Sequence, residues 1–179
     1  EGVGAEICGR LLVQEVFHTR CCKDDHSRQR RYHFYNGLLS FHGSDTELDD
    51  AWNAMILDIP AERLDMLKRL QDDHHLMLLS NTNNIHVPAF LQIVLEKNGI
   101  ADFRGLFDGT YFSCEMGMRK PDPAIFRHVL SCHDARPERS LFIDDSPQHV
   151  EGARKAGLHA QHLDLSKEDI IALSRRLDL

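Results

Sequence analysis

The pattern of apolar and polar residues changes along the chain. From about residue 61 onward, segments with apolar residues at helical spacing alternate with short, continuous apolar runs. The helical segments are 61–72, 87–97 and 166–176, with two more that begin near residues 123 and 147; the short runs are 76–80, 109–113, 141–144 and 159–163. Short apolar runs bounded by polar residues are typical of buried strands. Repeated strand and helix pairs predict an α/β fold with a largely parallel sheet covered by helices.

The first 58 residues show a different pattern. One helix is predicted over residues 47–57, whereas residues 20–35 are crowded with cysteine, histidine and arginine and follow neither a helical nor a strand period. We therefore expect two parts: residues 1–58 form a small helical cap or a divergent N-terminal region, and residues 59–179 form the α/β core.

Composition narrows the classes of partner. The 179 residues include 28 acidic and 21 basic side chains, for a formal charge of −7, and no basic stripe with interleaved aromatic residues follows residue 35. We therefore expect no nucleic-acid partner. The five cysteines are irregularly spaced, and no apolar run approaches 18 residues. These features predict a reduced, soluble, cytoplasmic protein without a membrane partner, and leave the oligomeric state open.

Two adjacent carboxylates follow the last strongly apolar run. Asp144 and Asp145 come directly after residues 141–143 and precede Ser146 and Pro147, which suit the start of a helix. The carboxyl ends of parallel strands are where α/β sheets bind ligands. Neighbouring carboxylates repel each other unless a cation or donor shares them, and Mg²⁺ prefers such hard oxygen ligands. Asp144 and Asp145 are therefore candidate Mg²⁺ ligands, although an exposed pair that only opens a turn would have the same sequence.

Two further motifs provide groups that could bind an anion. Ser80, Asn81 and Thr82 follow an earlier predicted strand, and their hydroxyl and backbone N–H groups suit phosphate oxygens. Lys120 precedes Pro121, which disfavours helical geometry at the lysine, and a helix is predicted to start directly afterwards. The ordinary alternatives are a turn and a flexible surface lysine. Together, the motifs favour a phosphate site with a fixed positive charge.

Taken in order, these motifs resemble those of the haloacid dehalogenase-like (HAD) hydrolase superfamily, over about residues 52–163. The resemblance implies a Rossmann-like core with a small helical cap. It implies that Ser80 orients a phosphoryl group, that Lys120 neutralises it and bridges to the nucleophile, and that Asp145 binds Mg²⁺ with Asp144 in support. The implied activity is that of a Mg²⁺-dependent phosphatase acting on a small phosphorylated metabolite through an aspartyl-phosphate intermediate.

A closer resemblance concerns the substrate class. Residues 79–83 with His86, together with residues 117–121, are similar to the branch that contains bacterial sugar-phosphate phosphatases. Dehalogenases and phosphonatases share the same core, so their chemistry stays open. A catalytically inactive or truncated phosphate- and metal-binding module is the alternative from another class.

One motif of the superfamily is absent. Members begin with a strand that ends in Asp-x-Asp, whose first aspartate is the nucleophile and whose second acts as acid and base. No Asp-x-Asp occurs in the 179 residues, and the apolar run 11–17 contains Gln14 and Glu15 instead. We therefore expect the first, nucleophile-bearing strand to be absent, most simply through a lost N-terminal segment. Alternatively, residues 11–17 fill the gap as an atypical strand, or the region is divergent or wrongly read.

Overall fold

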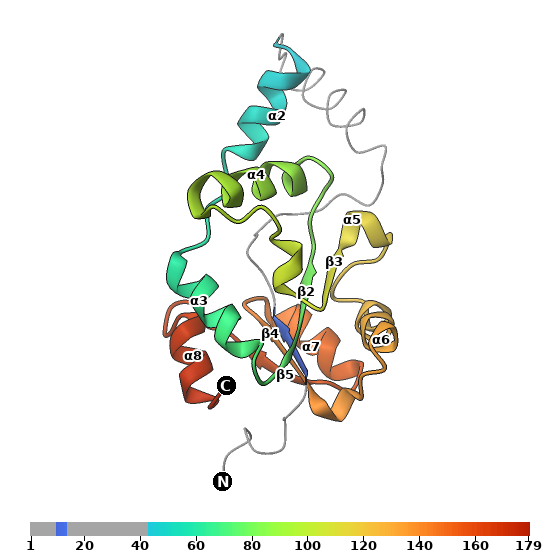
Figure 1. The fold of residues 1–179 in the computed structure, drawn as a ribbon. Helices are drawn as coiled ribbons and strands as arrows, with labels where there is room; N and C mark the ends of the chain where they lie inside the picture. Colours follow the sequence, from blue (N-terminus) through green and yellow to red (C-terminus); the bar gives the residue numbers. More distant parts are fainter. Residues whose placement is uncertain (1–9, 14–42) are drawn as a thin grey trace.

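The computed structural model describes residues 10–13 and 43–179. Its centre is a five-stranded sheet in which all strands run parallel, in the order β3-β2-β1-β4-β5 (Figure 1). The strands are β1 (Arg10–Val13), β2 (His75–Ser80), β3 (Gly109–Phe112), β4 (Ser140–Asp144) and β5 (His159–His162). The α/β fold predicted from the alternating pattern, and the Rossmann-like core that the resemblance implies, are therefore confirmed.

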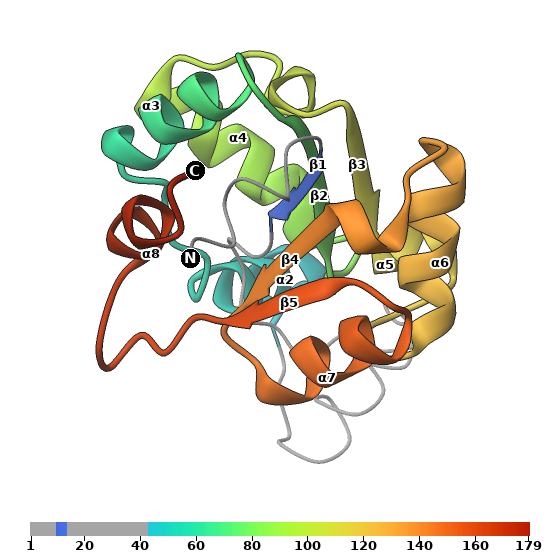
Figure 2. The ribbon, with the colours of Figure 1, turned by 90° about the horizontal axis from the view of Figure 1, so that it is seen from below.

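Helices cover both faces of the sheet. Those described are α2 (Asp45–Asn53), α3 (Ala61–Leu70), α4 (His86–Asn98), α5 (Ser113–Met116), α6 (Pro123–Cys132), α7 (Pro147–Lys155) and α8 (Ile170–Arg176), with 3₁₀ turns at Arg104–Leu106 and Pro137–Arg139. Figure 2 shows α3, α4 and α8 on one side of the sheet and α6 and α7 on the other. Among the described residues, no helix is long and apolar enough to cross a membrane.

The core consists of two apolar layers, one on each face. Along β2, Leu76 and Leu78 pack in the layer beneath α3, α4 and α8, whereas Met77 and Leu79 pack in the layer beneath α6 and α7. Successive side chains of a strand point to opposite faces, and a sheet covered on both faces needs apolar residues at every position. All four side chains are buried, which explains why the sequence shows a continuous apolar run rather than an alternating one.

The centre of the sheet is where the sequence left alternatives open for the first strand. There β1 lies between β2 and β4 and pairs in parallel with both. Val13 is in register with Leu78 on one side and with Ile143 on the other. Part of the run 11–17 therefore occupies the gap, in agreement with the alternative of an atypical strand, while the Asp-x-Asp motif is absent from the sequence. An empty gap would leave the inner edges of β2 and β4 with unpaired backbone groups, each costing about 1–3 kcal/mol.

Several element boundaries also differ in informative ways. The apolar spacing predicts a last helix over 166–176, but α8 begins at Ile170, because Asp169 caps it by accepting a hydrogen bond from the backbone of Ala172. The sequence suggests Ser146 as a side-chain cap for α7, yet no such hydrogen bond is formed. Its backbone N–H donates instead to Asp144 Oδ1, at 2.7 Å.

The described part of residues 1–58 contains one helix and one strand. Helix α2 starts with a capping box between Ser44 and Glu47. Near its end, the Trp52 ring stacks on His86 at the start of α4, with ring centroids 5.9 Å apart. Because β1 belongs to the sheet, residues 10–13 are part of the α/β unit rather than of a separate cap. Otherwise, the division into a cap and a core at residue 58 stays a prediction; residues 20–35 lie outside the described ranges.

Candidate active site

The predicted site residues sit at one edge of the sheet. Ser80 ends β2 and Asp144 ends β4, and these strands flank β1. Because Leu78 and Ile143 are both level with Val13, the register brings Asp145 level with Ser80. Parallel strands end at the same edge, so the polar residues that follow β2 and β4 come together there although they are far apart in sequence.

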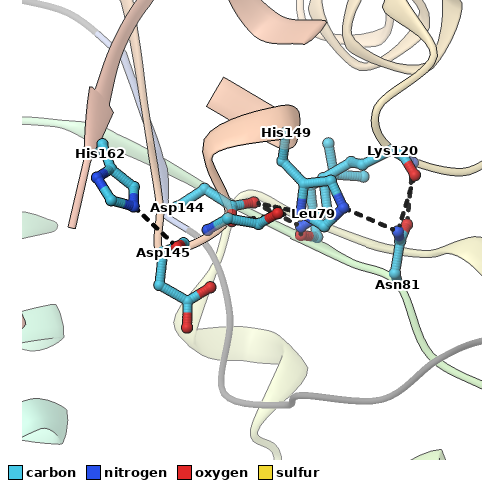
Figure 3. A network of polar contacts seen from close by, with 8 residues as sticks. Leu79, Asn81, Lys120, Asp144, Asp145, His149 and His162 are labelled. Atoms are coloured by element: carbon cyan, nitrogen blue, oxygen red, sulfur yellow. Dashed lines mark hydrogen bonds and ion pairs between the residues drawn. The ribbon is translucent and has the colours of Figure 1, made fainter. Parts of the chain in front are cut away.

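Lys120 joins these two strand ends through its side chain. Its Nζ donates to the carbonyl oxygen of Leu79 at 2.8 Å and lies 3.3 Å from Asp144 Oδ2 (Figure 3). The side chains of Lys120 and Asp144 are both fully buried. A buried charge is tolerated only when it is paired and hydrogen-bonded, and both conditions are met here. The structure therefore places Lys120 at the same end of the sheet as Asp144, as predicted from the sequence.

The backbone of Lys120 is held by Asn81. The Asn81 side chain donates from Nδ2 to the Lys120 carbonyl oxygen and accepts from the Lys120 N–H at Oδ1, each at 2.9 Å. The following peptide bond to Pro121 is cis. Helix α7 packs directly on this corner, because Gly152 has no side chain: a Cβ there would clash with the carbonyl oxygen of Pro121. Lys120 is therefore fixed through both its backbone and its side chain.

The two aspartates have different surroundings. Both carboxylate oxygens of Asp144 are engaged, by Lys120 Nζ, by the Ser146 N–H and by His149 Nδ1 at 3.0 and 3.2 Å. Asp145 is only partly buried. Its backbone carbonyl oxygen accepts from His162 Nε2 at 2.9 Å, as Figure 3 shows. Asp145 is therefore the more accessible of the two aspartates.

The carboxylate pair fits Mg²⁺ in kind but supplies only part of its ligand shell. Asp144 and Asp145 are hard oxygen donors, the type that Mg²⁺ binds, usually through one or two carboxylates with water and phosphate oxygens as the other ligands. In residues 43–179 and 10–13, no group of three or more carboxylate, imidazole or thiol side chains could hold a metal ion. The metal assignment of Asp144 and Asp145 stays a prediction.

Ser80 offers a hydroxyl group that the described chain does not use. Ser80 is 1% exposed, and its Oγ has no hydrogen-bond partner. Buried polar atoms are nearly always hydrogen-bonded, so an exception invites a functional explanation. Two residues on, the backbone of Thr82 is fixed by Ser113, whose Oγ accepts from the Thr82 N–H and donates to its carbonyl oxygen, each at 3.0 Å.

Three residues at this edge were not singled out from the sequence. His149 contacts Asp144, His162 contacts Asp145, and Ser113 anchors Thr82. Ser113 and His162 follow or end strands, so the rule that directed attention to Ser80 and Asp144 could have found them. His149 lies in the first turn of the helix after Asp145, where side chains can face back toward the strand ends.

A separate hollow lies at the opposite end of β2. It has a volume of about 350 Å³ and is lined by residues 71–75, 105, 107 and 108. Its Asp108 carboxylate accepts from the Leu76 N–H and contacts His75. None of the predicted site residues lies in this hollow. Its polar side chains therefore belong to the opposite edge of the sheet.

Comparison with known proteins gives a consistent result. A D-ribitol-5-phosphate phosphatase of Bacteroides thetaiotaomicron is 26% identical over 111 residues, which are 62% of this chain and 53% of that protein. A HAD family enzyme of the same organism, a mutant in complex with magnesium and inorganic phosphate, has a TM-score of 0.73 at 25% identity, covering 93% of this chain and 98% of that one. A HAD-like hydrolase predicted in Porphyromonas gingivalis shares the fold, with a TM-score of 0.68 at 24% identity, covering 97% and 99%.

The family model gives the most extensive sequence match. The chain spans about half the length of the D-ribitol-5-phosphate phosphatase and less of the other curated relatives it matches. The model of the haloacid dehalogenase-like hydrolases matches residues 37–157, which include Ser80, Lys120 and the aspartate pair. This is well over half of the chain, and the resemblance inferred from the motifs is confirmed. The chain belongs to the haloacid dehalogenase-like hydrolase family.

Proposed function

We propose that the edge formed by Ser80, Lys120 and Asp145 binds the phosphoryl group of a small phosphorylated metabolite together with Mg²⁺, as in a phosphoric monoester hydrolase. The observation that carries the proposal is the buried Lys120 ammonium, which donates to the carbonyl oxygen of Leu79, together with the buried hydroxyl of the next residue, Ser80, which has no partner. A fixed cation next to a free donor is what a phosphate dianion requires. The phosphatases among the relatives support the same class of activity.

Each residue of this site would have its own role in binding the phosphoryl group. Lys120 neutralises charge on the phosphoryl oxygens, and its two backbone hydrogen bonds to Asn81 prevent it from swinging away. Ser80 donates its hydroxyl hydrogen to another oxygen. Asn81, whose side chain is bonded to the Lys120 backbone, and Thr82, whose backbone is bonded to Ser113, form the neighbouring wall. Preorganised donors of this kind stabilise a transition state without having to reorient.

Asp145, supported by Asp144, would hold Mg²⁺ at the same edge. When bound, the ion supplies positive charge that offsets the negative charge of a phosphoryl group. Asp144 is proposed to act mainly as the counter-ion that positions Lys120, because its carboxylate already accepts from Lys120, Ser146 and His149 within the chain.

Two functions are compatible with this site. Hydrolysis also requires a nucleophile, which the family places directly after the first strand. Here β1 ends at Val13 and the sequence continues with Gln14 and Glu15. That observation favours a second candidate, a phosphate- and metal-binding module without hydrolysis. The phosphatase activity named for the relatives favours the hydrolase, with sugar and sugar-alcohol phosphates as the first substrates to test.

The binding part of the proposal is tested with Ser80→Ala. Calorimetry with inorganic phosphate in the presence of Mg²⁺ should show binding to the wild type and binding to Ser80→Ala that is weaker by about tenfold or more, because a hydrogen bond to a charged group contributes about 1.5–3 kcal/mol. The stability of the variant should not fall, because the hydroxyl makes no bond within the described chain.

Ser140→Ala is the matched control. Ser140 is equally buried but lies at the other end of the sheet, on β4, and its Oγ donates to the Arg136 carbonyl oxygen. This variant should lose stability and keep its phosphate affinity. Equal phosphate binding by wild type and Ser80→Ala would exclude Ser80 from the site, and absence of phosphate binding by the wild type would exclude both candidate functions.

A further inference from the structure

His149 occupies a place between the two halves of the site. It lies in the first turn of α7, and its side chain is only 12% exposed. Its Nδ1 faces the carboxylate of Asp144, at 3.0 Å from Oδ2 and 3.2 Å from Oδ1. Its Nε2 lies 3.5 Å from Asn81 Nδ2 (Figure 3). One imidazole ring therefore touches both the residue that pairs with the Lys120 ammonium and the residue that holds the Lys120 backbone.

These contacts close a ring of polar interactions. The ring runs from Asp144 to His149, from His149 to Asn81, from Asn81 to the Lys120 backbone, and through the lysine side chain back to Asp144. It connects four separate segments: the loop after β2, the corner before α6, the end of β4 and the first turn of α7. His149 is the member that joins Asp144 to Asn81, so removing its imidazole would open the ring.

The chemistry of the partners determines where the ring proton must be. The carboxylate of Asp144 can only accept, so Nδ1 must carry a hydrogen. Asn81 uses Oδ1 to accept from the Lys120 N–H and Nδ2 to donate, so the amide cannot be turned around without losing both bonds to Lys120. Its Nδ2 therefore faces His149 Nε2, at 3.5 Å. The contact with Asp144 is the one that places a hydrogen on the imidazole, at Nδ1.

We propose that His149 is a positioning residue of the phosphate site: it fixes Asp144 relative to Asn81 and so holds the Lys120 ammonium where the phosphoryl group binds. The proposal rests on the proposed function for its consequence, but the ring itself can be tested independently. Residues that orient the groups in direct contact with a ligand typically contribute about 10–100-fold in affinity.

The first experiment reads the position of the hydrogen. The imidazole ¹⁵N spectrum of the full chain should contain a ring that carries a hydrogen on Nδ1, and that signal should disappear in His149→Leu. A ring without a hydrogen on Nδ1 would have nothing to donate to Asp144 and would overturn the proposal. This readout requires neither phosphate nor metal.

The second experiment separates positioning from a general structural role. His149→Leu should bind inorganic phosphate in Mg²⁺ about tenfold more weakly than the wild type. His149→Asn retains a donor near the place of Nδ1, and His149→Gln an acceptor near the place of Nε2, so each should recover part of the affinity. Gln148→Leu, the exposed neighbour on α7, is the matched control and should bind phosphate as the wild type does.

The outcomes distinguish this proposal from the one on which it rests. Wild-type phosphate affinity in His149→Leu, or an equal loss in Gln148→Leu, overturns the role of His149 while the phosphate site stands. Failure of the wild type to bind phosphate overturns the proposed function, and the ¹⁵N spectrum still decides whether the ring exists.

Discussion

At the scale of single residues, the pair of Lys120 and Asp144 dominates the energetics of the site. Both side chains are fully buried, and the ammonium also lies 5.5 Å from the centre of the Phe142 ring. Removing water from two charges costs several kcal/mol for each ion, which their attraction and hydrogen bonds must offset. Such a pair contributes little net stability compared with an apolar pair. Its retention is therefore better explained by the positioned charge that it provides.

The first prediction follows from the cost of burying one of these two charges without the other. Lys120→Met removes the cation and leaves Asp144 buried with less compensation, so the free energy of unfolding should fall by about 3 kcal/mol. Urea denaturation measures the change. Lys155→Met, at an exposed lysine, is the matched control and should change stability by less than about 0.5 kcal/mol. A second change, Asp144→Asn, should recover part of the loss in the Lys120→Met background. An additive loss in the double variant would show that the two charges do not interact.

A second prediction separates the two aspartates. Asp145→Asn should reduce the Mg²⁺-induced rise in melting temperature more than any other single change at the strand ends, because its carboxylate is the better placed to bind a cation. Asp144→Asn should instead lower the melting temperature without Mg²⁺, since it removes the partner of Lys120. A thermal-shift titration measures both effects. An unchanged Mg²⁺ response in Asp145→Asn would remove Asp145 from the metal site.

A third prediction concerns Tyr111, on β3 outside the site. Burial, followed by the neighbouring Cys132, raises the pKa of Tyr111 to about 12, and its hydroxyl lies 2.7 Å from His133 Nε2. An unfolded tyrosine has a pKa of about 10. Because the pKa of Tyr111 is higher in the folded state, the neutral hydroxyl contributes to stability. This contribution is present below about pH 10 and is lost as the pH rises toward 12. Between about pH 9 and 11, Tyr111→Phe should therefore lose less stability than the wild type in urea denaturation; equal losses would contradict the shift.

At the scale of elements, the contact between α7 and the corner at Lys120 depends on one glycine. Gly152 lies inside α7, where alanine would normally favour the helix by about 1 kcal/mol. A Cβ at this position would clash with the Pro121 carbonyl oxygen, which is backbone and cannot turn aside. Helix propensity and packing therefore predict opposite signs for the same substitution.

We expect packing to outweigh propensity. Gly152→Ala should lower the free energy of unfolding by about 1–2 kcal/mol, within the usual range for overpacking, and weaken phosphate binding by displacing Lys120. Glu151→Ala, at the exposed neighbouring position of α7, is the control and should leave phosphate binding unchanged. Stabilisation by Gly152→Ala would show that α7 does not constrain the corner.

The elements also show what the sequence could and could not predict. The buried strands β2 and β4 and the helices α4 and α6 followed from apolar spacing, with Gly99 ending α4 in a left-handed conformation and Asp122 capping α6. These signals are local. For the first strand the sequence left two alternatives open, an absent strand or an atypical one within residues 11–17, because the place of such a strand depends on pairing with β2 and β4.

The site was predictable to a similar extent. Ser80, Lys120 and Asp145 follow from strand ends and a proline corner, and the structure brings the segments that carry them to one edge. The links between them were not predictable. The contact of His149 with Asn81 joins residues 68 positions apart and depends on how α7 lies across the sheet. The sequence also does not specify which of the two adjacent aspartates points its side chain toward Lys120.

At the scale of the whole molecule, the sheet topology gathers the site. Lys120 lies 40 residues after Ser80 and 25 before Asp145 in the sequence, and only parallel strands with helical crossovers bring such distant segments to one edge. The strand order places β1 between β2 and β4. In the sequence, Val13 is followed by Gln14 and Glu15 rather than by Asp-x-Asp.

The last prediction follows from the absence of Asp-x-Asp in the sequence. The 179-residue chain should bind phosphate with Mg²⁺ but should hydrolyse p-nitrophenyl phosphate no faster than background, because a glutamine amide is a poor nucleophile and no Asp-x-Asp is present to take up the phosphoryl group. Phosphate binding by the same preparation, measured by calorimetry, shows that the site is intact.

A robust Mg²⁺-dependent rate that Lys120→Ala abolishes would contradict the prediction. Glu15 would then be the first carboxylate to test, and loss of the rate in Glu15→Gln, but not in Glu6→Gln, would identify it as the group that takes the place of the aspartate.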